Sequence, residues 1–153
     1  GGGMGLVLTG LNRNITAASI GIPGLCDHTA FLQGRAPGWP KALGDVARRK
    51  MAPEQIATMT KILPYFDAVN FARRIRVPVI VCMGYLDTTC APSSVYAAYN
   101  VISAPKSILP DPNQGHGVSR ENAAIVARWI REKLGLPNDA VAPKTPATPV
   151  EGD

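Results

Sequence analysis

The stretch VPVIVCMGYLD, residues 77–87, is the part of the sequence from which the fold can be predicted. Its first seven residues form an apolar, largely β-branched run, and such a run is typical of a parallel strand that is buried on both faces. A glycine and then Asp87 follow the run closely. The stretch therefore predicts a central strand over residues 77–83, with Asp87 just beyond its carboxyl end.

Two further strands are expected, one on each side of this stretch in the sequence. Residues 15–23 are apolar, rich in isoleucine and ended by a Pro-Gly pair, which predicts a buried strand. Residues 106–109 predict a short strand, and the loop 111–117 that follows it contains His116. About three parallel strands are therefore expected.

Helical segments are expected between and around these strands. Strands that alternate with helices indicate an α/β fold, in which a parallel sheet carries helices on both faces. Residues 25–40 are rich in turn residues and predict one long loop, and long loops are more often functional than idle. The expected helices cover residues 3–12, 41–50, 53–63 and 67–74 (capped by Asp67), the segment that opens at Pro92, and the amphipathic segment capped by Ser119 that carries Ile125, Val126, Trp129, Ile130 and Leu134 on one stripe.

Composition excludes several classes of protein. The chain has 153 residues, of which 46% are hydrophobic and 18% charged, which excludes a disordered charged tail, a collagen-like repeat and a coiled coil. No apolar run approaches the roughly 18 residues of a membrane span, so no membrane partner is expected. The net charge is +5, but the basic runs lack interleaved aromatic residues, so no nucleic-acid partner is expected either.

Cys26, Cys82 and Cys90 are odd in number and lack the spacing of metal ligands, so no metal is expected. Cys26 and Cys82 lie in apolar runs and are predicted to be buried thiols. Residues 1–135 are expected to form the C-terminal part of one larger domain, followed by a Pro-rich, disordered tail over residues 136–153.

Asp87 and His116 are the candidate catalytic residues. Each follows the carboxyl end of a predicted strand, which is where open α/β sheets bind ligands. A carboxylate that accepts a hydrogen bond from an imidazole fixes its tautomer and stabilises the imidazolium. Taken singly, Asp87 also fits a turn or cap residue, and His116 fits a loop histidine bonded to backbone. Their joint placement favours the catalytic interpretation.

The first residues, GGGMG, are unusual for a helix, because each glycine costs about 1 kcal/mol relative to alanine. They make sense where a helix packs tightly against a strand just after a nucleophile turn of the pattern Gly-x-Ser-x-Gly. We therefore expect the sequence to start just after such a turn, within a larger domain whose earlier strands precede Gly1.

Several stretches together resemble the acetyl xylan esterase and cephalosporin C deacetylase group of α/β-hydrolases: GGGMGLVLTGL, IPGLCDH, YFDAVNFARRIRVPVIVCMGYLDTTCAPSSVYAAYN and NQGHG. The resemblance implies that Asp87 is the acid and His116 the base of a catalytic triad, with the serine two residues before Gly1. It implies a serine esterase that deacetylates carbohydrates or related small O-acetyl esters. It implies no metal or organic cofactor, and a homo-oligomer. Gly117 and Val118, just after the base, are expected to border the acyl pocket.

Two alternatives remain. In a second register Gly3 takes the place of the serine, which would make the protein an inactive relative with a binding or structural role, but this misplaces Pro23 and Cys26 by two residues. Another branch of the fold, such as a dienelactone hydrolase or a peptidase, shares the order of the triad. No serine within the sequence completes the triad, because Ser19 lies on a predicted strand, Ser93 and Ser94 follow Asp87, and Ser119 is a helix cap. Residues 1–153 alone are thus expected to be inactive.

Three further positions have two interpretations each. Residues 33–39 fit either a pocket wall or a surface excursion. His28 fits a site residue or, more often, a structural histidine. Tyr96 and Tyr99 are spaced i, i+3 on a predicted helix, which favours packing over substrate stacking.

Overall fold

The computed structural model describes residues 1–44 and 50–137, and its centre is a parallel sheet of three strands. The strands are β1 (Ala18–Gly21), β2 (Val79–Gly84) and β3 (Lys106–Asp111), in the order β1-β2-β3. Val81 pairs with Ile20 on one side and with Ile108 on the other. All residues of β2 are buried, as the apolar run predicted.

The first strand is shorter than predicted. Only residues 18–21 belong to β1, whereas the apolar pattern predicted residues 15–23. The strand ends because Ile22 has a positive φ of 46°, a backbone conformation that turns the chain out of the extended direction. The strand prediction was correct in kind and position but wrong in length.

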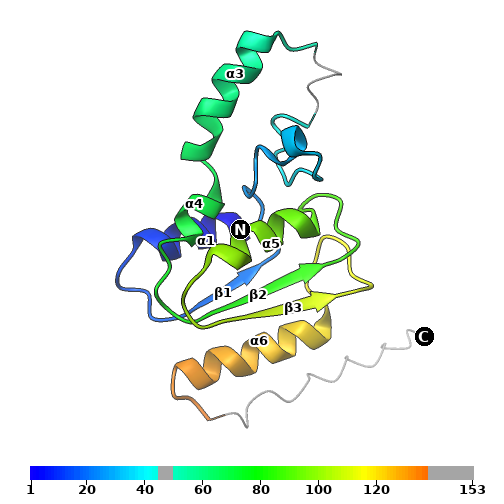
Figure 1. Ribbon diagram of the computed structural model, residues 1–153. Helices are drawn as coiled ribbons and strands as arrows, with labels where there is room; N and C mark the ends of the chain where they lie inside the picture. The colour runs from blue at the N-terminus through cyan, green and yellow to red at the C-terminus, as the bar shows by residue number, and fades with distance from the viewer. Residues whose placement is uncertain (45–49, 138–153) are drawn as a thin grey trace, which may run out of the picture.

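Helices cover both faces of the sheet (Figure 1). On one side lie α1 (Gly2–Leu11), α4 (Ala68–Ala72) and α5 (Pro92–Val101), and on the other lies α6 (Arg120–Lys133). This is the layered α/β arrangement that the alternation of strands and helices predicted. The core lies mainly between the sheet and the first group of helices; it includes Leu6, Ile20, Cys26, Ala68, Ala72, Ile75, Val79, Val81, Met83, Cys90, Val95, Ala98 and Ile102.

The glycines of α1 allow the close packing that the sequence predicted. A Cβ on Gly2 would overlap the carbonyl oxygen of Gly21, and one on Gly3 would overlap that of Gly24. On the same helix, a Cβ on Gly10 would overlap the carbonyl oxygen of Phe71, at the end of α4. The helix therefore lies against backbone at both of its ends, and only glycine fits there.

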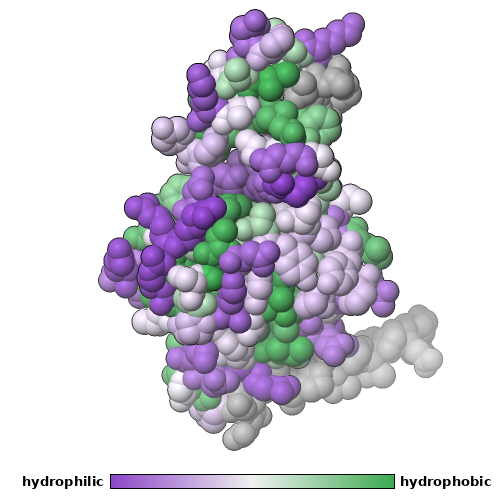
Figure 2. All heavy atoms as spheres, in the orientation of Figure 1, coloured by the Kyte–Doolittle hydropathy of each residue, from purple (hydrophilic) through white to green (hydrophobic). Residues whose placement is uncertain are grey.

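A second group of elements projects from the sheet layer (Figure 1). It contains η1 (Ala30–Gln33), α3 (Pro53–Ile62) and η2 (Leu63–Tyr65). No residue of α3 is buried. Apolar side chains reach the surface of this part of the molecule (Figure 2). Ile62, at the end of α3, is 49% exposed. Pro53 opens α3 as predicted. The helix predicted over residues 41–50 includes residues 45–49, which lie outside the described residues.

Two predicted helix caps are confirmed. The side chain of Asp67 accepts a hydrogen bond from Val69 N at the start of α4, and Ser119 Oγ accepts one from Asn122 N at the start of α6. α4 is shorter than predicted because tight turns follow it, in which Arg74 N donates to Phe71 O and Ile75 N donates to Ala72 O.

The apolar stripe of α6 is only partly covered. Val126 and Trp129 are half-buried, but Ile130 and Leu134 are exposed, and Asn122 is the single buried residue of this helix. The stripe exists, yet it does not form the packed face that its spacing predicted. Of the tail predicted to be disordered, only residues 136 and 137 lie within the described residues. No described helix combines the length and the apolarity needed to cross a membrane.

Candidate active site

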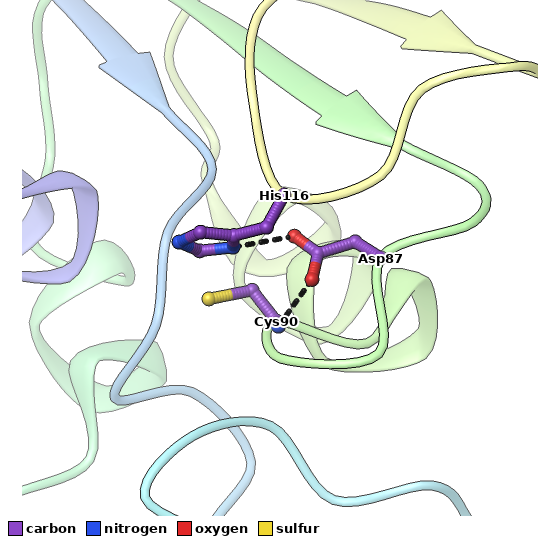
Figure 3. A group of neighbouring side chains, drawn as sticks. All are labelled: Asp87, Cys90 and His116. Carbon is purple, nitrogen blue, oxygen red and sulfur yellow. Dashed lines mark hydrogen bonds and ion pairs between the residues drawn. The ribbon is translucent and has the colours of Figure 1, made fainter.

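The structure brings Asp87 and His116 together at the carboxyl ends of β2 and β3. The imidazole Nδ1 of His116 lies 2.9 Å from Oδ2 of Asp87, although 29 residues separate them in the sequence (Figure 3). This is the juxtaposition expected from strand ends that meet at one edge of a parallel sheet.

Asp87 is held by its own loop. Its side chain is fully buried, and Oδ1 accepts hydrogen bonds from the backbone nitrogens of Thr89 (2.7 Å) and Cys90 (2.9 Å). The turn interpretation and the orienting interpretation of Asp87 are therefore compatible, because one carboxylate oxygen shapes the turn while the other faces His116.

The loop that carries His116 lies across the end of β2 because Gly84 has no side chain. A Cβ on Gly84 would overlap the carbonyl oxygen of Gln114 and would also collide with that of Gly115. Backbone hydrogen bonds tie the two loops together, from Tyr85 N to Asp111 O (2.9 Å) and from Leu86 N to Gln114 O (3.0 Å). Gly84 is thus a residue of the site that the sequence interpretation missed.

A cavity of about 510 Å³ opens beside the imidazole. The N-terminal end of α1 and the loop after β1 form much of its wall, and the side chain of His116 is 54% exposed. The lining residues are Gly1, Gly3, Met4, Ile22, Gly24, Leu25, Trp39, Thr89, Cys90 and His116. Most of this wall is apolar, which suits a small, weakly polar group.

The predicted role of Gly117 and Val118 at an acyl pocket stays a prediction. Neither lines this cavity, and Val118 Cγ2 instead lies 3.6 Å from the position of a Cβ on Gly21, at the end of β1. Among the serines, Ser93 Oγ donates to Ala36 O and Ser94 Oγ to Ala91 O. No serine among the described residues lines the cavity.

Trp39 connects the two walls of the cavity. Its backbone nitrogen donates to Thr89 O (2.9 Å), and its carbonyl oxygen accepts from Leu25 N (2.9 Å). The indole lies against Gly24, where a Cβ would be in ordinary contact with Trp39 Cε3 at 3.6 Å. The pocket-wall interpretation of residues 33–39 therefore holds for Trp39, whose side chain stays accessible in a residue that is 53% exposed.

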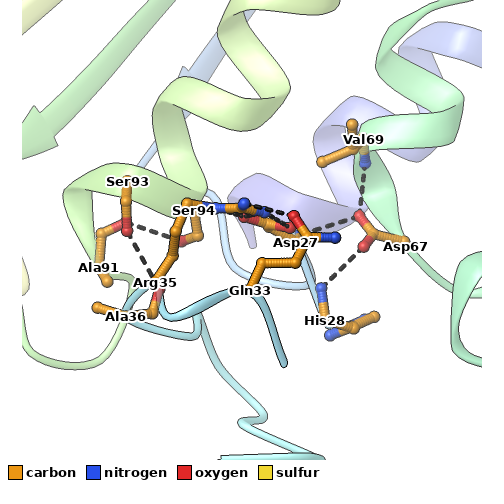
Figure 4. A network of polar contacts seen from close by, with 10 residues as sticks. All are labelled: Asp27, His28, Gln33, Arg35, Ala36, Asp67, Val69, Ala91, Ser93 and Ser94. Atoms are coloured by element: carbon orange, nitrogen blue, oxygen red, sulfur yellow. Dashed lines mark hydrogen bonds and ion pairs between the residues drawn. The ribbon is translucent and has the colours of Figure 1, made fainter. Parts of the chain in front are cut away.

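The loop after β1 is braced by a polar network (Figure 4). The carboxylate of Asp67 accepts hydrogen bonds from the backbone nitrogens of Asp27 (3.1 Å) and His28 (2.8 Å), and Arg35 forms an ion pair with Asp27 at 2.8 Å. This loop contains Leu25, which has a positive φ of 59° and lines the cavity. The bracing offsets the cost of the left-handed backbone, which is about 1 kcal/mol or more per residue.

His28 and the two tyrosines have structural positions. His28 is 2% exposed, does not line the cavity, and has no partner for its Nδ1 within the described residues. The rings of Tyr96 and Tyr99 form an edge-to-face pair with centroids 6.5 Å apart, and both pack against the core. Tyr96 Oη also lies 3.2 Å from Tyr85 Oη, and this hydrogen bond raises the pKa of Tyr96.

Cys90 is a further residue that the sequence interpretation did not place in the site. It is 4% exposed and lines the cavity, and a sulfur, a carboxylate oxygen and an imidazole nitrogen from Cys90, Asp87 and His116 lie within 4.8 Å of one another (Figure 3). Burial, followed by the nearby charge of Asp87, raises the pKa of the Cys90 thiol. The feature of the sequence that could have indicated a place in the site is its position three residues after Asp87. The predicted burial of Cys26 and Cys82 is confirmed.

Comparisons with known proteins agree on one family. The family model described as acetyl xylan esterase matches residues 1–132. An acetyl esterase, Axe7A of Xylanibacter ruminicola, is 35% identical over 134 residues, which are 88% of this chain and 29% of that protein.

Two solved structures are similar along most of the chain. The acetyl xylan esterase from Paenibacillus sp. R4 superposes with a TM-score of 0.75 and 27% identity, covering 86% of this chain and 42% of that one. Acetyl xylan esterase 1 from Thermoanaerobacterium sp. JW/SL YS485 gives a TM-score of 0.73 and 28% identity, covering 87% and 43%. The chain thus spans less than half the length of these relatives. With its parallel sheet, its flanking helices and a family match over residues 1–132, the chain belongs to the acetyl xylan esterase family of α/β-hydrolases.

Proposed function

We propose that the full-length protein is a serine esterase that removes acetyl groups from carbohydrates or related small O-acetyl esters, with Asp87 and His116 as the acid and base of its triad. The observation that carries this proposal is the 2.9 Å contact between a fully buried carboxylate and an imidazole that borders an apolar cavity. A carboxylate in this position keeps the imidazole in the tautomer whose Nε2 accepts a proton.

In the proposed mechanism the nucleophile is a serine two residues before Gly1. His116 takes the proton from the serine hydroxyl as its oxygen attacks the acetyl carbonyl carbon, and then delivers this proton to the leaving alcohol oxygen. A water molecule, activated by His116 in the same way, releases acetate from the acyl-enzyme. Asp87 remains ionised and stabilises the imidazolium at each transfer.

The location of Gly1 supports this position for the serine. Gly1 and Gly3 line the same cavity as His116, so a residue just before Gly1 would be close to the imidazole. The first amide groups of α1 have no acceptor within the helix and form the positive end of its dipole. Negative charge on the carbonyl oxygen of the tetrahedral intermediate is favoured at such a helix end.

The alternative, an inactive relative with Gly3 in place of the serine, is disfavoured by the position of Gly3. This residue lies within α1, and a Cβ there would overlap the carbonyl oxygen of Gly24. A side chain at residue 3 would therefore meet backbone, whereas a nucleophile must project freely into the cavity.

The test uses the full-length protein with acetylated xylan and nitrophenyl acetate as substrates, and measures released acetate and nitrophenol. Alanine in place of the serine two residues before Gly1, or His116→Ala, is expected to lower kcat at least 10³-fold. Residues 1–153 alone are expected to show negligible turnover. An unaltered kcat in His116→Ala, or turnover by residues 1–153 comparable to that of the full-length protein, would overturn the proposal.

The same preparation tests the expected assembly. The resemblance implies a homo-oligomer. Light scattering coupled to size-exclusion chromatography is therefore expected to give the mass of two or more full-length chains. A mass of one chain would contradict this expectation without affecting the catalytic proposal.

A further inference from the structure

The cluster of Asp87, Cys90 and His116 has the composition of a transition-metal site. Thiolate, imidazole and carboxylate are the three ligand types that proteins use for Zn²⁺. One ligand atom from each residue lies within 4.8 Å of the other two. The sequence interpretation paired Asp87 with His116 but did not place Cys90 beside them, and the pairing of β2 with β3 brings all three together.

Two of the three ligands are already held in place. Asp87 and Cys90 are 3% and 4% exposed, and they share one short loop, in which Asp87 Oδ1 accepts a hydrogen bond from Cys90 N (2.9 Å). The side chain of His116 is 54% exposed, so its ring has room to adjust to an ion. A site with two fixed ligands and one adjustable ligand loses little conformational freedom on binding.

The thiol of Cys90 is both unpartnered and open to the cavity. Within residues 1–44 and 50–137, Cys26 Sγ donates to Gly24 O, whereas Cys90 Sγ has no hydrogen-bond partner. A Cβ on Gly24 would lie only 3.3 Å from Cys90 Sγ, so the absence of a side chain there leaves that side of the sulfur accessible. An ion that enters the cavity can therefore reach the sulfur beside the imidazole.

We propose that Asp87, Cys90 and His116 form an inhibitory site for a thiophilic divalent ion such as Zn²⁺ or Cd²⁺. The ion binds the Cys90 sulfur with release of the thiol proton to solvent, and binds one imidazole nitrogen of His116 and one carboxylate oxygen of Asp87. The fourth coordination position is left to water in the cavity. No electron is transferred. His116 bound to the ion cannot take up the serine proton, so the inhibitory effect, unlike the binding itself, rests on the proposed esterase function.

The ligand set also determines which ions bind. Mg²⁺ and Ca²⁺ prefer oxygen ligands in larger number and do not favour a thiolate. The site is therefore selective for soft or borderline ions and is not a general cation site.

Cd²⁺ is the probe for binding, because a bond between Cd²⁺ and a thiolate gives an ultraviolet charge-transfer band that is independent of any activity. Titration of the full-length protein is expected to give this band at one Cd²⁺ per chain. Cys90→Ser is expected to lose the band, whereas the matched control Cys82→Ser, which alters a buried thiol within β2, keeps it. His116→Ala is expected to bind Cd²⁺ at least tenfold more weakly. Circular dichroism establishes that each variant is folded.

The activity arm uses Zn²⁺ and Mg²⁺ with nitrophenyl acetate. Zn²⁺ is expected to inhibit reversibly, with activity recovered after a chelator is added, whereas Mg²⁺ at the same concentration has no effect. A band that persists in Cys90→Ser, or an affinity unchanged in His116→Ala, would overturn the proposed site. A protein with no esterase activity but with the expected Cd²⁺ band would contradict the proposed function and leave the metal site supported.

Discussion

The carboxylate of Asp87 is fully buried, whereas the imidazole of His116 that it contacts at 2.9 Å is half exposed. This asymmetry suits a general base that a fixed carboxylate orients. The buried partner is held by two backbone hydrogen bonds and keeps its orientation, while the exposed partner presents its other nitrogen to the cavity. The pair therefore combines a fixed charge with an accessible base.

If the proposed triad is right, Asp87→Asn is expected to lower kcat of the full-length protein about 10⁴-fold, the loss that this change causes in a characterised Ser-His-Asp enzyme. The amide oxygen can still accept from Thr89 N and Cys90 N, but the amide nitrogen then faces His116 Nδ1 and forces the proton onto Nε2. Release of nitrophenol is the measurement. The control is Asp111→Asn at the end of β3, which faces Asn113 N and is expected to retain most of the activity. Equal losses in the two variants would contradict the orienting role.

Trp39→Ala is expected to raise KM for acetylated xylan fragments more than for nitrophenyl acetate. The indole forms an accessible apolar wall of the cavity and can contact a sugar ring that a simple acetate ester lacks. Trp39→Phe keeps an aromatic ring, so its KM for acetylated xylan fragments should lie between that of the wild type and that of Trp39→Ala. Trp129→Phe on α6 serves as the control. A similar rise in KM for both substrates would show that Trp39 supports the loop and not the substrate.

Gly10→Ala is expected to destabilise the full-length protein by about 1–3 kcal/mol, because the added methyl group overlaps the Phe71 carbonyl and separates α1 from α4. Gly5→Ala on the same helix is the matched control. Its Cβ meets only the flexible Ile20 Cδ1 at 3.0 Å, and alanine favours the helix. Denaturant unfolding should place Gly10→Ala below and Gly5→Ala at or above the wild-type stability; the reverse order would refute the packing argument.

Asp67→Ala is expected to cost about 2–4 kcal/mol, since it leaves the backbone nitrogens of Asp27 and His28 without an acceptor and removes the cap of α4. The free energy of unfolding from urea titration is the measurement. Asn70→Ala, also in α4, removes an exposed hydrogen bond to Pro64 O of η2 and is expected to change stability by only about 0.5 kcal/mol. Indistinguishable values for the two variants would mean that the network does not hold the loop.

Among the thiols, Cys90 is expected to react first with a disulfide reagent in the folded full-length protein, because it alone of the three cysteines lines the cavity. Burial raises the pKa of all three thiols, so each carries little thiolate at neutral pH and its reaction should accelerate as pH rises. The Asp67 charge adds to the effect on Cys26, which should react last. Mass spectrometry of the labelled peptides identifies the order. Labelling of Cys26 before Cys90 would contradict the described cavity.

Much of the architecture was predictable from local sequence. Burial on both faces requires a continuous apolar run, so residues 77–83 indicated a central parallel strand, and Asp87 followed at its end. The glycines of α1 indicated close backbone contact, because no other residue allows it. The length of β1 was not predictable, since the apolar pattern continues through Ile22 while the backbone turns there.

The candidate site was likewise predictable only in part. The sequence by itself determined that Asp87 and His116 follow two strands, and parallel strands place their carboxyl ends at one edge. Only the tertiary structure decided which other residues reach them. Trp39 and Cys90 line the cavity through hydrogen bonds and close contacts between loops distant in sequence, and Gly84 allows one loop to cross another. Such contacts depend on the paths of several loops at once, whereas strands and their ends follow from the periodicity of one segment.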